Sequence, residues 1–218
     1  RCFTTTRKET SAMANIPFLR PQLVPLSSYA HYLEGMDERR WYTNFGPLNT
    51  QFEQRILDEY FAGEGAVASL QNCTLGLMLA IDAMKRPGGK YALMPSFTFA
   101  ATPQAAMWCG LEPWFVDVDP HSWATDTGKL QAAIDRLGDD VAVVVSYATF
   151  GSCIDLAPYE QVMKQGVPVV IDAAPAFGSC EHGRQFGRGF PGAVVFSFHA
   201  TKACGIGEGG LVYSGDSS

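Results

Sequence analysis

The sequence predicts an α/β fold, a three-layer αβα sandwich around a mainly parallel sheet. Short apolar runs alternate with segments of helical periodicity along most of the chain, which is the pattern of parallel strands joined by helices. Residues 141–146 are apolar almost throughout, as expected of a strand that is covered on both faces. The chain has 218 residues, of which 47% are hydrophobic and 17% are charged, which is enough for one sizeable core.

The segment before the sheet is predicted to be an arm. Residues 16–21 contain two prolines and are expected to be extended. Residues 29–37 are predicted to form a short helix, and residues 41–47 a turn or loop that ends in Gly-Pro. Residues 48–60 then show helical periodicity, with apolar side chains on one face and mostly charged side chains opposite.

From residue 65 onward, strands and helices alternate. The helices are marked by an apolar period of three to four and by turn signals such as Pro87-Gly-Gly89. The predicted strands are 65–70, 91–94, 112–117, 141–146, 167–172 and 193–196, and the predicted helices between them are 75–84, 102–109, 130–137 and 156–164. The final run, from Gly210, indicates one further strand to which the pattern assigns no place in the sheet.

We expect three parts along the chain. Residues 1–15 are expected to be disordered or foreign to the native protein, and we favour sequence upstream of a start at Met13 over a weak transit-like segment. Residues 16–47 form the N-terminal arm, and residues 48–218 form the large domain. Because the chain stops after its last strand without a capping helix, we expect the large domain to be truncated at its C-terminus.

Composition excludes several kinds of function. The formal net charge is −6 and no basic residues cluster, which argues against a nucleic-acid surface. No apolar run approaches the length needed to span a bilayer. The six cysteines include no C-x-x-C pair and the four histidines have no ligand spacing, so we expect no metal site and no disulfide framework. Reduced thiols fit a cytoplasmic protein.

Two residues at predicted strand ends carry the chemical hypothesis. Asp172 ends one apolar run, and Lys202 follows the next run 30 residues later (202 − 172), just before a glycine-rich stretch. Strand ends of an open α/β sheet place side chains in its crevice. An amine that binds an aldehyde and a carboxylate that holds a ring nitrogen protonated are what pyridoxal 5′-phosphate (PLP) chemistry requires. Taken singly, Lys202 fits a surface lysine equally well, and Asp172 fits a helix cap better.

Other residues would complete such a site. The turn that begins at Asn72 directs backbone N–H groups and the Thr74 hydroxyl toward an anion, although alone it indicates only a helix cap. Ser197 offers a second hydroxyl, or is simply an exposed polar residue. Phe99 follows a strand end and suits stacking on a ring, or core packing. His199 suits tuning of Lys202, or a structural role.

On these residues the chain resembles the DegT/DnrJ/EryC1/StrS aminotransferases, PLP enzymes of the type I fold that aminate keto-sugars. The resemblance covers residues from about 16 to the end, and the stretch that contains Lys202 is its most specific part. The matching stretches are Asn44-Phe-Gly-Pro47, Asn72-Cys-Thr-Leu-Gly-Leu77, Pro95-Ser-Phe-Thr-Phe-Ala-Ala-Thr102, Phe115-Val-Asp-Val-Asp119, Ile171-Asp-Ala-Ala174 and Ser197-Phe-His-Ala-Thr-Lys202 with Gly207-Glu-Gly-Gly210.

The resemblance implies a role for each candidate. Lys202 would be the Schiff-base lysine and general acid–base, and Asp172 would pair with the pyridinium nitrogen. Phe99 would stack on the ring. The phosphate would be held by Thr74, the Leu75 backbone N–H and Ser197.

One position departs from the family pattern. Relatives usually have a glutamine three residues after the aspartate, and this chain has Pro175 there. Some relatives replace the lysine with histidine and act as dehydratases, whereas this chain keeps Lys202.

The implied reaction is transfer of an amino group, from glutamate by family analogy, to a nucleotide-linked keto-sugar. The resemblance further implies a homodimer with sites at the subunit interface and a C-terminal small domain beyond Ser218. Two alternatives stay open: a truncated or degenerate domain without catalytic activity, and a type I PLP lyase or dehydratase.

Overall fold

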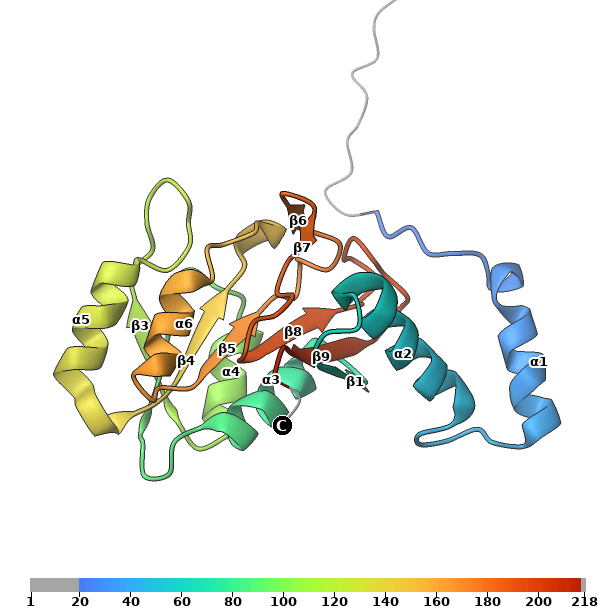
Figure 1. The fold of residues 1–218 in the computed structure, drawn as a ribbon, viewed down its shortest axis with the longest axis horizontal. Coiled ribbons are helices and arrows are strands. Elements are labelled where there is room, and N and C mark those ends of the chain that lie inside the picture. The colour runs from blue at the N-terminus through green and yellow to red at the C-terminus, as the bar shows by residue number, and fades with distance from the viewer. Residues whose placement is uncertain (1–19, 217–218) are drawn as a thin grey trace, which may run out of the picture.

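A computed structural model describes residues 20–216, which form a seven-stranded sheet with helices on both faces (Figure 1). Within this sheet only β9 runs opposite to the other strands, so the prediction of a mainly parallel sheet is confirmed. In spatial order the strands are β1 (Ala66–Leu70), β9 (Gly210–Ser214), β8 (Ala193–Ser197), β5 (Val169–Asp172), β4 (Val141–Tyr147), β2 (Tyr91–Pro95) and β3 (Glu112–Val116).

The helices divide into two layers, as predicted for an αβα sandwich. One apolar cluster joins the sheet to α2 (Pro47–Phe61), α5 (Thr127–Leu137) and α6 (Ala157–Lys164). A second cluster, on the other face, joins it to α3 (Cys73–Met84) and α4 (Ala101–Trp108). β4 lies between the two clusters and is buried along nearly its whole length, which explains its unbroken apolar sequence.

The N-terminal elements lie at one side of the molecule. The short helix predicted at 29–37 is α1 (Ala30–Arg39), which follows a 3₁₀ turn, η1 (Leu26–Ser28). α1 buries no side chain and stands away from the sheet beyond α2 (Figure 1). The predictions for residues 1–15, and for the first part of the arm, lie outside the described residues.

Three features differ from the sequence prediction. The final strand, to which no place was assigned, lies inside the sheet as β9, between β1 and β8. A small hairpin of β6 (Cys180–Glu181) and β7 (Arg184–Gln185) was not predicted, because strands of two residues leave no alternating pattern. Short 3₁₀ turns, which are equally local, appear as η2 (Gly138–Asp140) and η3 (Thr149–Gly151).

α3 lies close to the sheet, because two glycines, one in the helix and one in β9, leave room at separate points of the contact. A Cβ atom at Gly76 of α3 would come within 2.7 Å of Val195 Cγ1 on β8. A Cβ atom at Gly210 would come within 2.5 Å of the Asn72 carbonyl carbon, just before the helix begins. The close approach fixes the N-terminus of α3 against the ends of β8 and β9.

Over residues 20–216, no helix is long and apolar enough to cross a membrane, and no group of three His, Cys, Asp or Glu side chains is placed to hold a metal ion. The five cysteines in this part of the chain are all free thiols.

We predict that Gly210→Ala lowers the free energy of unfolding by about 1–3 kcal/mol, because the added methyl group would overlap the Asn72 backbone. Urea unfolding measures the change. Gly35→Ala is the matched control: Gly35 lies in α1 with no atom near its would-be Cβ, so this change should leave stability equal or raise it by up to about 1 kcal/mol. Equal stability of Gly210→Ala and the unaltered protein would contradict the close packing of α3 on the sheet.

Candidate active site

The candidate residues gather at one edge of the sheet. β2, β4, β5 and β8 run parallel, and β1 runs in the same direction because β9 is antiparallel to both β1 and β8. The carboxyl ends of these strands therefore share an edge. The chain leaves β2 for β3 and returns to β4 on the other side of β2, which is the reversal of strand order beside which α/β proteins bind ligands.

Asp172 ends the central strand β5 and is only 1% exposed. Its Oδ2 accepts a hydrogen bond from Thr102 Oγ1 at 2.6 Å, and its Oδ1 accepts one from the Ala174 N–H at 3.1 Å. Burial raises the pKa of the Asp172 carboxyl above its ordinary value, and these two hydrogen bonds together with the charge of Lys202 oppose that rise. The carboxylate is thus desolvated but held by oriented donors.

Lys202 lies in the loop that joins β8 to β9. Backbone hydrogen bonds order this loop: the Ala200 N–H donates to the Gly207 carbonyl, and the Lys202 N–H donates to the His199 carbonyl at 2.9 Å. Gly205 packs its backbone against Ala200, where a Cβ atom would meet the carbonyl oxygen at 2.7 Å. The Lys202 side chain forms no ion pair within residues 20–216, although its charge acts on Asp172.

The predicted phosphate contacts meet at the start of α3. Asn72 caps the helix, and its Oδ1 accepts a hydrogen bond from the Leu75 N–H at 2.8 Å. The Leu75 N–H, one of the predicted phosphate donors, therefore already has a partner, whereas the Thr74 hydroxyl has no hydrogen-bond partner among the described residues. Ser197 is buried at the end of β8 and pairs with Gly210, which contacts Asn72. The two predicted hydroxyls therefore lie at one corner of the sheet.

Phe99 and His199 have contrasting surroundings. Phe99 lies just before α4 with 68% of its surface exposed, so core packing does not account for it. His199 Nδ1 lies 2.8 Å from Thr201 Oγ1, and Nε2 lies 3.6 Å from Glu208 Oε1. Both ring nitrogens of His199 face protein groups, which favours the structural role. Pro175 follows Asp172 in a turn, with its carbonyl oxygen against Gly151.

Three residues beside Asp172 were not identified as site residues from the sequence. Thr102, at the start of α4, donates to the carboxylate. Tyr147 ends β4 directly opposite Asp172 in the register, and burial raises the pKa of its hydroxyl, with a further rise from the Asp172 charge. Cys73 packs its thiol 3.8 Å from the Val195 carbonyl, and burial raises its pKa. In the sequence, only their positions mark these three residues as candidates, because each lies at the end of a strand or the start of a helix.

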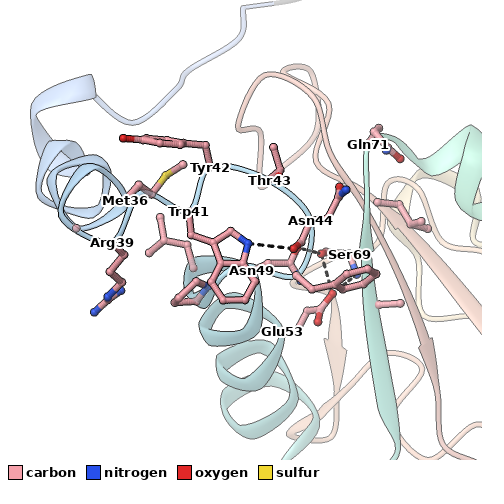
Figure 2. Close-up of a pocket in the computed structure, with 17 residues that line it drawn as sticks. Met36, Arg39, Trp41, Tyr42, Thr43, Asn44, Asn49, Glu53, Ser69 and Gln71 are labelled. Atoms are coloured by element: carbon pink, nitrogen blue, oxygen red, sulfur yellow. Dashed lines mark hydrogen bonds between the residues drawn. The ribbon is translucent and has the colours of Figure 1, made fainter.

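A separate cavity of about 670 Å³ lies beside the free edge of the sheet (Figure 2). The loop after α1 contributes Trp41, whose indole N–H donates to the Asn44 carbonyl at 3.3 Å. Glu53 of α2 accepts both the N–H and the hydroxyl of Ser69 on β1, at 2.7 and 2.8 Å. Gln71, the residue before the Asn72 cap, also lines the cavity, so the cavity lies next to the start of α3, where Thr74 is found.

An open α/β sheet with a buried carboxylate at the end of one strand, and a lysine in the loop after the neighbouring strand, is the arrangement that the sequence motifs associate with PLP enzymes. The chain belongs to the DegT/DnrJ/EryC1/StrS aminotransferase family, whose sequence profile matches residues 27–218. The prediction made from the motifs is thereby confirmed.

Individual proteins show the same relationship. A putative PLP-dependent aminotransferase from Bacillus cereus is 53% identical with a TM-score of 0.92, over 93% of this chain and 55% of that one. DesI, solved with its TDP-sugar product, is 33% identical with a TM-score of 0.77, over 90% of this chain and 48% of that one. Protein Rv3402c of Mycobacterium tuberculosis is 37% identical over 94% of this chain and 51% of its own length. The chain thus spans about half the length of the relatives that it matches.

We predict that Asp172→Asn leaves the free energy of unfolding at pH 7 equal or higher. Because burial raises the folded-state pKa of Asp172, the stability contributed by this group is present below the unfolded pKa and is lost as the pH rises through the folded pKa. A neutral amide avoids that loss, and Thr102 can reverse its hydroxyl to accept from it. Urea unfolding at pH 7 and at mildly acid pH should show the two proteins converging in acid; lower stability of Asp172→Asn at pH 7 would contradict a raised pKa for the Asp172 carboxyl.

Proposed function

We propose that this chain is the cofactor-binding part of a PLP-dependent aminotransferase that transfers an amino group, from glutamate, to a nucleotide-linked keto-sugar. The observation that carries the proposal is the fully buried carboxylate of Asp172, within electrostatic reach of the Lys202 amine and held by donors rather than by an ion pair. A buried carboxylate is costly unless donors or an opposite charge compensate for its lost hydration, and a cationic ligand group would add to the compensation that the two donors give. The activity is proposed for the full-length protein.

The residues present fit PLP. Asp172 keeps free lone pairs on both oxygens, and the small side chains of Ala173 and Ala174 follow it. PLP, when bound, supplies an electron-withdrawing ring that stabilises negative charge on the substrate carbon attached to it. Asp172 would accept the hydrogen bond of the ring N–H and keep that nitrogen protonated.

The remaining side chains take complementary parts. Lys202 would bind the cofactor and then hold and move a proton at Nζ. Thr74 and Ser197 would donate hydroxyls to the phosphate at the positive end of α3. Leu75 would contribute its N–H by sharing the hydrogen bond that Asn72 now accepts. The exposed ring of Phe99 would pack on the cofactor ring.

The substrate class is supported by relatives. DesI was solved with a TDP-sugar as its product and shares the fold over 90% of this chain. Glutamate as the donor, a homodimer as the assembly and the cytoplasm as the location rest on the family resemblance, and each is part of the proposal.

We predict that Lys202→Ala abolishes covalent PLP binding and lowers transamination by at least about a hundredfold, because both cofactor attachment and proton transfer depend on Nζ. The measurements are the visible spectrum of the full-length protein with PLP, borohydride reduction with peptide mapping, and amino transfer from glutamate to a panel of nucleotide keto-sugars. Lys164→Ala, at an exposed lysine of α6, is the matched control and should behave as the unaltered protein.

Two outcomes would contradict the proposal. A borohydride-reduced adduct that maps to a lysine other than Lys202 would remove the assigned residue. A folded full-length protein that forms no adduct would instead support the alternative of a non-catalytic domain.

A further inference from the structure

Thr102 and Asp172 form the shortest side-chain contact in the site, at 2.6 Å between Oγ1 and Oδ2. Neither residue reaches solvent, since Thr102 is 0% and Asp172 1% exposed. The distance lies in the range of charge-assisted O–H···O⁻ hydrogen bonds, which are about twice as strong as neutral ones. The two residues come from different layers, α4 and β5, so the contact ties the helix to the centre of the sheet.

A second hydroxyl continues this contact. Thr98 Oγ1 lies 2.9 Å from Thr102 Oγ1. A hydroxyl has a single proton, and that of Thr102 is given to the ionised carboxylate, so Thr98 must be the donor in the second hydrogen bond. The two hydroxyls thus form a directed chain, Thr98 to Thr102 to Asp172, in which each bond polarises the next.

We propose that Thr102, supported by Thr98, is the positioning residue that keeps Asp172 ionised and oriented toward the ring nitrogen of the cofactor. The assignment of a cofactor partner to Asp172 rests on the proposed function, whereas the effect of Thr102 on the carboxylate does not.

The local backbone fixes this arrangement. The Thr102 N–H donates to the Phe99 carbonyl at 3.0 Å, so the first turn of α4 locks both residues in one rigid element. The same turn therefore carries the exposed ring of Phe99 and the hydroxyl that donates to the carboxylate. The titratable groups around Asp172 are Lys202 after β8, whose charge lowers the pKa of Asp172, and Tyr147 on β4 and Cys73 on α3, whose own pKa values the Asp172 charge raises. Of the influences that lower the pKa of Asp172, the Thr102 hydrogen bond is the largest.

The direct test is titration of the Asp172 carboxyl in the cofactor-free full-length protein. The carbon signal of ¹³C-labelled aspartate is followed by NMR against pH, and Asp172→Asn assigns it. Thr102→Val keeps the side-chain shape and removes the hydroxyl, so the Asp172 pKa should rise. Thr102→Ser restores the donor and should restore the titration. Thr125→Val removes another buried hydroxyl, one bonded to Ser146 and not to Asp172, and should change nothing.

A second variant keeps the test decisive if Thr102→Val does not fold. Thr98→Val removes the outer hydroxyl from a half-buried position before the helix, and should raise the Asp172 pKa by less than Thr102→Val does. An Asp172 titration unchanged in the folded Thr98→Val and Thr102→Val proteins, or in Thr98→Val alone if the other does not fold, would overturn the proposal.

The cofactor readout separates this inference from the proposed function. With PLP, Thr102→Val should weaken binding about tenfold or more, as expected for the loss of a hydrogen bond to a charged group, and Thr102→Ser should bind as the unaltered protein does. If the unaltered protein binds PLP through Lys202 and Thr102→Val binds equally well, the inference fails while the function stands. If the unaltered protein binds no PLP, the function fails and the titration still decides the effect of Thr102.

Discussion

The burial of the Asp172 carboxylate is the constraint on which the rest of the site depends. A charge in the middle of a sheet loses its hydration, and only oriented donors or an opposite charge offset that loss. The parallel strands place Asp172 between β4 and β8, where it is only 1% exposed. Donors must therefore come from the chain, and they come from Thr102 and from the Ala174 N–H. A site arranged in this way is poised for a cationic ligand.

The packing of α3 on the neighbouring strands positions the groups that would bind a phosphate. A phosphate needs free N–H groups and hydroxyls held at a fixed distance from the buried carboxylate. Gly76 and Gly210 allow the N-terminus of α3 to lie directly on β8 and β9, so Thr74 and Ser197 reach one corner. The glycines after Lys202 were expected to let backbone approach a ligand. In the fold, Gly205 instead allows close contact with the Ala200 backbone within the loop, and Gly210 allows close contact with the Asn72 backbone at the start of α3.

The sequence predicts the layers well and the contacts between them poorly. Periodicity is a local signal, so the alternation of strands and helices, and the candidate strand ends, could be read from residue patterns alone. The place of β9 could not, because an apolar strand pairs equally well at an edge or between two neighbours, and topology decides which. Thr102 was missed for the same reason. Nothing in residues 95–102 indicates that this hydroxyl, and not that of Thr98, meets a carboxylate 70 residues further along the chain.

The antiparallel direction of β9 explains how Lys202 comes to lie near Asp172. A parallel partner for β8 would require a long crossover, usually through a helix, and would carry the chain away from the edge where β8 ends. A hairpin returns at once, so the loop of Lys202 stays beyond β8, directly beside the strand that ends in Asp172. The pairing of β5 with β8 places Asp172 opposite Val195, so the loop that carries Lys202 follows the strand next to Asp172. The antiparallel strand β9 is thus what keeps Lys202 near Asp172.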